Sequence, residues 1–229
     1  MTAEKPFAGA GKVGESLFSP WERRFVARYV ASVPRGVETY HLTLLTVVWC
    51  VGILLFGWLA QSNSQWLWMI SVMIVCQYIT DLFDGAVGRH RNTGLVKWGF
   101  FMDHFLDYVF LCAILTAYHT VAPKGYDGWF MVLLGLTGAH MAHSFLAFAA
   151  TNEFRIAFHG VGPTEMRLAF IGINTFTMYT PARYYEYTLP AVTVAVLAGL
   201  IVVVFNTQRQ LWKIDMNAKR ASDERSAGQ

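Results

Sequence analysis

The chain has 229 residues, of which 55% are hydrophobic and 14% are charged, whereas an average soluble domain has about a quarter charged residues. Its mean hydropathy is +0.37, and apolar runs reach the roughly 20 residues that a helix needs to cross a bilayer. These values exclude an ordinary soluble domain, and the formal net charge of +3 is too small to indicate a nucleic-acid partner. The composition predicts an all-α integral membrane protein.

The stretch 20–33, ahead of the first apolar run, predicts an amphipathic helix. Its apolar side chains repeat every four residues, at Trp21, Phe25, Tyr29 and Val33. Arginines fall between them, and a basic amphipathic helix of this kind lies on an anionic membrane surface. A plain juxtamembrane segment is the alternative interpretation. We assign residues 1–40 to a cytoplasmic N-terminal segment that contains this interfacial helix.

Six apolar segments follow, and each predicts a transmembrane helix. In chain order they cover residues 41–60, 65–86, 98–118, 128–150, 164–179 and 188–207. The fifth is the shortest and contains Arg167. Together they form a six-helix transmembrane domain over residues 41–208. Residues 209–229 form a polar cytoplasmic tail, in which we expect 215–229 to be frayed.

Lysine and arginine indicate the orientation of these spans, because cytoplasmic loops of membrane proteins are enriched in both residues. With six spans, 16 of the 18 lysines and arginines fall on one side. Lys124 and Arg183 fall on the other. Both termini are therefore expected in the cytoplasm, and the bacterial inner membrane is the expected location.

Four aspartates lie on two consecutive spans. Asp81 and Asp84 come near the end of the second span, and Asp103 and Asp107 near the start of the third. Spacings of three and four place each pair on one face of its helix. The topology brings both pairs to the cytoplasmic end, where four carboxylates need cations nearby. Because hard divalent ions such as Mg²⁺ prefer oxygen ligands, the aspartates predict a metal site.

The residues beside the first pair suit a diphosphate. Gly85 and Gly88 carry no side chain, so a phosphate could approach the backbone closely. Arg89 adds a planar guanidinium fork that matches a phosphate. Two metal ions about 4 Å apart can hold the attacking and leaving oxygens of a phosphoryl displacement. Acids, glycines and an arginine thus favour phosphoryl transfer from a nucleotide-diphosphate donor.

This pattern resembles the signature of the CDP-alcohol phosphotransferase family. The family has D-x-x-D-G-x-x-A-R, about nine residues, and then G-x-x-x-D-x-x-x-D. Here D-L-F-D-G-A-V-G-R stands at 81–89 and G-F-F-M-D-H-F-L-D at 99–107, with nine residues between them. Seven of the eight fixed positions agree. The exception is Gly88, where the family usually has alanine.

The resemblance implies a role for each matching residue. The metal ligands, for two Mg²⁺ or Mn²⁺ ions, would be Asp81, Asp84 and Asp103, with Asp107 beside the metals as general base on the acceptor hydroxyl. The pocket for the CDP moiety would be shaped by Gly85, Gly88, Arg89 and Gly99. The reaction would transfer a substituted phosphate from a CDP-linked donor to an alcohol, releasing CMP, in phospholipid biosynthesis. Family members commonly form homodimers.

A weaker likeness concerns the choline/ethanolamine phosphotransferases. Gly162-Pro163-Thr164-Glu165 and Asp103-His104 are similar to stretches of those enzymes, which transfer from CDP-choline or CDP-ethanolamine to diacylglycerol. CDP-diacylglycerol with a polar alcohol is the other substrate pair, and both stay open. Family members often begin the first span with Asn-x-Leu-Thr, where this chain has Tyr40-His41-Leu42-Thr43, without the asparagine. The remaining candidates for substrate contacts are Thr43, His104, Arg155, Glu165 and Arg167.

Two further interpretations compete for the same polar residues. A membrane cation channel or transporter could use the aspartate cluster as an ion site. It predicts acids near the bilayer midplane and repeat symmetry, and the sequence shows no internal repeat. His140 and His143, three apart on the fourth span, suit an interhelical hydrogen bond, the lining of a cavity or a metal pair.

Overall fold

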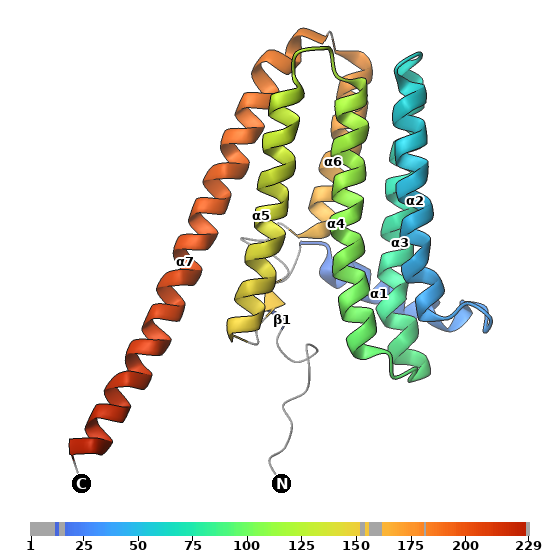
Figure 1. The fold of residues 1–229 in the computed structure, drawn as a ribbon. Helices are drawn as coiled ribbons and strands as arrows, with labels where there is room; N and C mark the ends of the chain where they lie inside the picture. Colours follow the sequence, from blue (N-terminus) through green and yellow to red (C-terminus); the bar gives the residue numbers. More distant parts are fainter. Residues whose placement is uncertain (1–11, 14–16, 152–153, 156–161, 181, 228–229) are drawn as a thin grey trace.

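The computed structural model describes residues 12–13, 17–151, 154–155, 162–180 and 182–227. These residues are almost entirely helical, which confirms the all-α prediction. The α-helices are α1 (Ser19–Tyr29), α2 (Thr39–Ala60), α3 (Leu67–Arg91), α4 (Val96–Val121), α5 (Asp127–Thr151), α6 (Pro163–Tyr179) and α7 (Tyr185–Ala227) (Figure 1). Short 3-10 turns cover Val30–Ser32, Ser64–Trp66 and Ala182–Tyr184. Two short strands, β1 (Lys12–Val13) and β2 (Phe154–Arg155), pair in parallel.

Within the described ranges, five helices are long and apolar enough to cross a membrane. They are α2, α3 with its preceding turn, α4, α5 and α7, and they contain five of the six predicted spans. The fifth predicted span corresponds to α6, which has 17 residues and buries Arg167 and Asn174. A helix of this length lies at the lower end of the roughly 17–25 residues with which helices cross a bilayer. The fifth predicted span, and with it the total of six, therefore stays a prediction.

Helices α2, α3 and α4 pack together around an apolar core. Its most buried members include Ile53, Ile70, Ile74 and Ile114. Gly57 of α2 lies against Ala117 of α4 so closely that a Cβ at Gly57 would be 2.7 Å from the Ala117 Cβ. Helix α6 packs against α3, and this contact places α6 beside the helix that carries the first aspartate pair.

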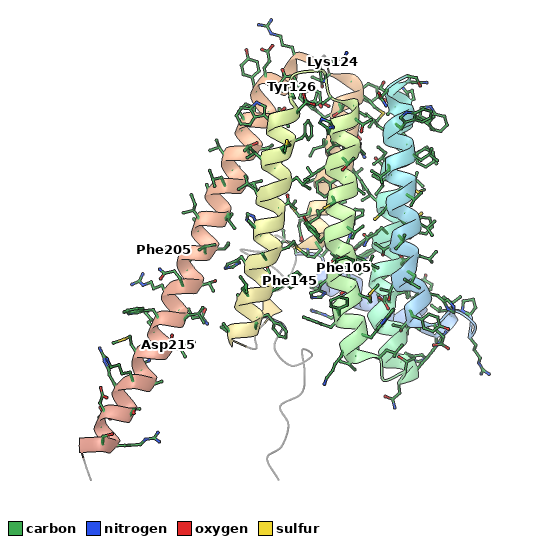
Figure 2. All side chains as sticks on the ribbon, in the orientation of Figure 1. Phe105, Lys124, Tyr126, Phe145, Phe205 and Asp215 are labelled. Carbon is green, nitrogen blue, oxygen red and sulfur yellow. The ribbon has the colours of Figure 1, made fainter. Side chains whose placement is uncertain are left out.

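Helix α7 packs against α5 near the loop that contains Lys124. The residues that join the two helices are Phe130, Leu133, Tyr185 and Leu189. Toward its C-terminus α7 leans away from the bundle (Figure 1), and Asp215 lies at the opposite end of the molecule from Lys124 (Figure 2).

Helix α7 continues to Ala227, so the prediction of a frayed tail was wrong for the described part of 215–229. Seven of the thirteen residues 215–227 are alanine, arginine, lysine or glutamate, which are strong helix formers.

Helix α1 lies against α3, well before the C-terminal end of that helix (Figure 1). Pro20 stands in its first turn, where proline's missing N–H is no loss. Phe25 stacks on Trp21, with ring centroids 5.4 Å apart, and meets the edge of Phe83 on α3 at 5.9 Å. The helix predicted for 20–33 is therefore present, while its location on a membrane surface stays a prediction.

Candidate functional site

The four aspartates predicted to act together line one small cavity between α2, α3 and α4. The other residues that line it are Leu42, Thr43, Thr46, Gln77 and Leu106. The tight connection between α3 and α4 brings the two pairs side by side. Asn92 ends α3 with φ at 53°, and Gly94 follows with φ at 73°. These left-handed conformations are tolerated by asparagine and glycine, and they let α4 begin antiparallel at Val96.

Asp84 is held by α2, which carries none of the four aspartates. The Thr43 hydroxyl donates a 2.6 Å hydrogen bond to Oδ2 of Asp84. The Thr39 hydroxyl donates to the backbone carbonyl of Asp84 at 3.2 Å. The Asp84 side chain is buried, and its Oδ1 has no hydrogen-bond partner among the described residues. A buried carboxylate oxygen without a donor is costly, and a cation would relieve that cost.

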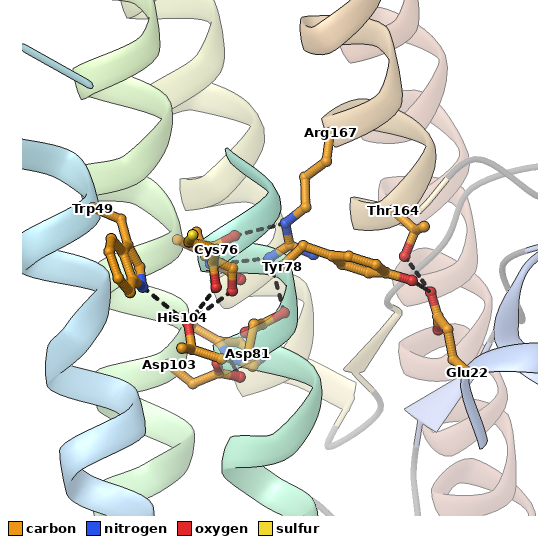
Figure 3. A network of polar contacts seen from close by, with 12 residues as sticks. Glu22, Trp49, Cys76, Tyr78, Asp81, Asp103, His104, Thr164 and Arg167 are labelled. Atoms are coloured by element: carbon orange, nitrogen blue, oxygen red, sulfur yellow. Dashed lines mark hydrogen bonds and ion pairs between the residues drawn. The ribbon is translucent and has the colours of Figure 1, made fainter. Parts of the chain in front are cut away.

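Arg167 reaches the aspartates from α6 (Figure 3). Its Nη2 lies 2.8 Å from Oδ2 of Asp81 and 3.7 Å from Oδ1 of Asp107. Its Nε donates a 2.7 Å hydrogen bond to Oε1 of Gln77, and its guanidinium carbon lies 5.7 Å from the centre of the Tyr78 ring. Arg167 was predicted as a substrate contact, and the structure adds that it is buried in an ion pair with the aspartate cluster.

The predicted nucleotide-binding residues have separate surroundings. A Cβ at Gly88 would lie 2.8 Å from Oγ1 of Thr39, so this glycine allows the close approach of α2 and α3. Gly99 has open space where a Cβ would stand, and at Gly85 a Cβ would first meet Nη1 of the exposed Arg89, at 3.1 Å. Gly85 and Gly99 therefore leave room for a ligand, whereas Gly88 serves helix packing. Their nucleotide contacts stay predictions.

Glu165 lies in the first turn of α6, and Arg155 lies on β2 ahead of that helix. Oε2 of Glu165 accepts a 2.8 Å hydrogen bond from the Gly162 amide and so caps α6. Its Oε1 accepts a 2.9 Å bond from the Leu17 amide, which ties the N-terminal segment to α6. The backbone of Arg155 belongs to β2, and its side chain lies outside the described residues. These contacts give Glu165 a structural task beside the predicted substrate contact.

His104 contacts one of the four aspartates, whereas His140 and His143 lie on α5. Nδ1 of His104 is 3.2 Å from Oδ2 of Asp103, and its ring packs against Phe100 with centroids 4.4 Å apart. Nε2 of His143 lies 3.1 Å from Oγ1 of Thr207 on α7. That contact favours the interhelical hydrogen bond among the interpretations of the pair on α5. His140 bonds within its own helix, with Nδ1 3.0 Å from the Leu136 carbonyl.

Several residues around the site were not predicted from the sequence. Glu22 of α1 accepts hydrogen bonds from the Tyr78 hydroxyl at 2.9 Å and from the Thr164 hydroxyl at 2.6 Å (Figure 3). Gln77 holds Arg167. A signal existed for Gln77, because it is a polar residue in an apolar helix, four positions before Asp81 and on the same face. No local pattern links Glu22 to residues 56 and 142 positions away.

The donor atoms of the site suit a hard divalent cation, since they are carboxylate oxygens that converge on one cavity. The unpartnered Oδ1 of Asp84 is a further sign of fit. Over the described ranges, however, no three side chains of His, Cys, Asp or Glu already form a group that could hold a metal ion. Arg167 pairs with Asp81 and Asp107, and Thr43 holds Asp84. The ligand types are therefore in place, and a metal would require side-chain adjustment.

Comparison with curated proteins gave no match. The model of the CDP-alcohol phosphatidyltransferase family matches residues 41–212, about three quarters of the chain. The matched range begins within α2, includes all four aspartates and Arg167, and ends within α7. The chain therefore belongs to the CDP-alcohol phosphatidyltransferase family, which transfers a phosphatidyl-type group from a CDP-linked donor to an alcohol in phospholipid synthesis.

Proposed function

We propose that this protein is a divalent-metal-dependent CDP-alcohol phosphotransferase of phospholipid biosynthesis. The observation that supports this most is the convergence of four carboxylates from α3 and α4 on one cavity, in a chain of this family. The family generally depends on divalent metals. The proposed ligands of two Mg²⁺ or Mn²⁺ ions are Asp81, Asp84, Asp103 and Asp107. When bound, such ions neutralise the charge of a diphosphate and of its leaving group.

Asp107 is the proposed general base. The acceptor hydroxyl oxygen attacks the phosphorus that carries the donor's alcohol, and its proton passes to a carboxylate oxygen of Asp107. The bond from that phosphorus to the bridging oxygen breaks, and CMP leaves with the electron pair. The Asp107 side chain lines the cavity and is 32% exposed, so it is accessible to an acceptor hydroxyl that enters the cavity.

Two donor classes are compatible with these residues. One is CDP-diacylglycerol with a polar alcohol, and the other is CDP-choline or CDP-ethanolamine with diacylglycerol. Arg89, Gly85 and Gly99 are the proposed contacts of the CDP moiety, with Gly88 beside them. Further candidate contacts, with the donor or the acceptor, are Thr43, His104, Arg155, Glu165 and Arg167. The proposal includes a homodimer in the bacterial inner membrane, with the site and both termini on the cytoplasmic side.

The test is a donor and acceptor panel. Purified protein in lipid nanodiscs receives each CDP-linked donor with each acceptor class, in Mg²⁺, in Mn²⁺ and in EDTA, and released CMP is measured. We expect CMP release with one donor class, abolished by EDTA and restored by added metal. The panel also names the substrate.

A folded preparation that releases no CMP with any pair would contradict the proposal. The Asp103→Asn variant is the matched negative control, because it removes one proposed ligand charge and keeps the side-chain shape. The channel or transporter alternative makes a different prediction, namely Mn²⁺ flux into sealed liposomes without nucleotide. Measuring that flux on the same preparation separates the two functions.

A further inference from the structure

The aspartate cavity is already approached by a cation that belongs to the protein. Arg167 comes from α6, outside the aspartate motif, and its side chain is 7% exposed. We propose that Arg167 is a built-in counter-ion, which pairs with Asp81 and Asp107 when metal is absent and competes with the divalent cation for these two carboxylates. This inference rests on the proposed function, because it concerns the same metal centre.

The contacts of Arg167 show why it acts as a counter-ion. Its Nη2 lies at hydrogen-bond distance from Asp81, at 2.8 Å, and at ion-pair distance from Asp107, at 3.7 Å. A guanidinium stays protonated in proteins and offers donors only. It therefore compensates carboxylates at any pH at which the protein is folded. Since a buried charge is tolerated when it is paired, the metal-free cluster gains stability from this arginine.

The same contacts imply competition. Oδ2 of Asp81 already accepts from Arg167, and a carboxylate oxygen bound to a guanidinium is a weaker ligand for a second cation. Two positive charges a few ångströms apart also repel each other strongly in a buried site. A metal that binds Asp81 and Asp107 must therefore weaken both ion pairs. The absence of a ready metal-binding group among the described side chains agrees with this arrangement.

When Asp81 and Asp107 bind the metal ion, contacts with uncharged side chains would still hold Arg167 in place. Its Nε donates to Gln77 at 2.7 Å, and its guanidinium lies over the Tyr78 ring at 5.7 Å. Neither contact uses a carboxylate. The exchange therefore needs a change in ion pairing and leaves α6 in place. Arg167 would remain next to the cavity as a cation without its acidic partners.

The experiment measures Mn²⁺ binding to the purified full-length protein, without nucleotide or lipid substrate, by isothermal titration calorimetry or electron paramagnetic resonance. Arg167→Gln removes the charge, and we expect it to bind Mn²⁺ about tenfold more tightly than wild type, because one nearby positive charge disappears. Arg167→Lys retains the charge and should stay within about threefold of wild type. An unchanged or weaker Mn²⁺ affinity in Arg167→Gln overturns the proposal.

The second measurement is the thermal unfolding temperature, with and without Mn²⁺. Arg167→Gln should unfold at a lower temperature than wild type in EDTA and show a larger rise in unfolding temperature on addition of Mn²⁺. Arg167→Met, an unbranched apolar side chain, should change the Mn²⁺ affinity in the same direction. Both variants are purified in saturating Mn²⁺, under which the proposal expects them to fold. Failure of both to fold with Mn²⁺ present contradicts exchange of the arginine for metal.

The outcomes separate this inference from the proposed function. If wild-type protein binds no Mn²⁺, the metal centre of the proposed function fails together with the exchange. If wild type binds Mn²⁺ and releases CMP, but the neutral variants bind Mn²⁺ no more tightly, the function stands and the counter-ion proposal falls.

Discussion

The hydroxyl of Thr43 donates a 2.6 Å hydrogen bond to Oδ2 of Asp84, and this bond joins α2 to α3 inside the aspartate cavity. Both side chains are buried. The bond orients the Asp84 carboxylate and leaves its Oδ1 without a partner among the described residues. A helix without an aspartate of its own thus sets the direction of one of the four proposed ligands.

Thr43→Val tests this orienting contact. Valine has nearly the shape of threonine and lacks the hydroxyl, so Asp84 loses this hydrogen bond. A buried acceptor that is left unsatisfied costs about 1–3 kcal/mol. We expect the Mg²⁺ concentration for half-maximal CMP release to rise by about tenfold. Thr175→Val is the control, since the Thr175 hydroxyl bonds to the Ile171 carbonyl of its own helix. An equal response of the two variants would show that Thr43 has no specific effect on Asp84.

Asp107→Asn and Asp84→Asn should separate the base from a metal ligand. Asparagine keeps the shape of aspartate and cannot accept the proton. Loss of a general base costs about 10²–10⁴-fold in rate, so Asp107→Asn should lose transfer. It should still bind the CDP-linked donor, because the other three proposed metal ligands are unchanged. Asp84→Asn should lose metal-dependent donor binding as well. Turnover is measured as CMP release and binding by equilibrium dialysis, and near-native turnover of Asp107→Asn would remove it from the base role.

Gly57→Ala tests the contact between α2 and α4. An added Cβ would lie 2.7 Å from the Cβ and 2.9 Å from the Cα of Ala117. Overpacking of this kind costs about 1–3 kcal/mol, and the unfolding temperature in detergent should fall. Gly135→Ala is the matched control, because Gly135 lies within α5 and has no atom within 4 Å of the added Cβ. There the better helix propensity of alanine should leave stability equal or slightly higher.

Glu22→Ala tests the attachment of α1. Glu22 accepts hydrogen bonds from Tyr78 on α3 and Thr164 on α6, and bonds to a charged acceptor contribute about 1.5–3 kcal/mol each. Because the contacts are half-buried, we expect amide hydrogen exchange across Ser19–Tyr29 to rise by about tenfold. Glu22→Gln keeps one acceptor oxygen, so its amide exchange rate should lie between those of wild type and Glu22→Ala. Arg24→Ala, at an exposed position of the same helix, should exchange as wild type does.

Much of the site could be predicted from local spacing. Asp81 and Asp84, three apart, must share a helix face, and the short connection to the next span brings Asp103 and Asp107 to the same end. The long apolar runs predicted the membrane helices in the same way, because an apolar run, like the aspartate spacing, is a property of residues close together in the sequence. The weak points were elements whose state depends on context. Helix α6 has 17 residues, and α7 continues through the polar stretch that was expected to fray.

The sequence by itself determined the aspartate motif, its helical faces and the family, because these depend on residue types at short, regular separations. Only the tertiary structure decided that Thr43 orients Asp84, that Gly88 makes room for Thr39, and that Arg167 pairs with Asp81. These contacts join residues 41, 49 and 86 positions apart. They arise from how α2, α3 and α6 pack, and no periodicity along one helix encodes the rotation of another helix against it.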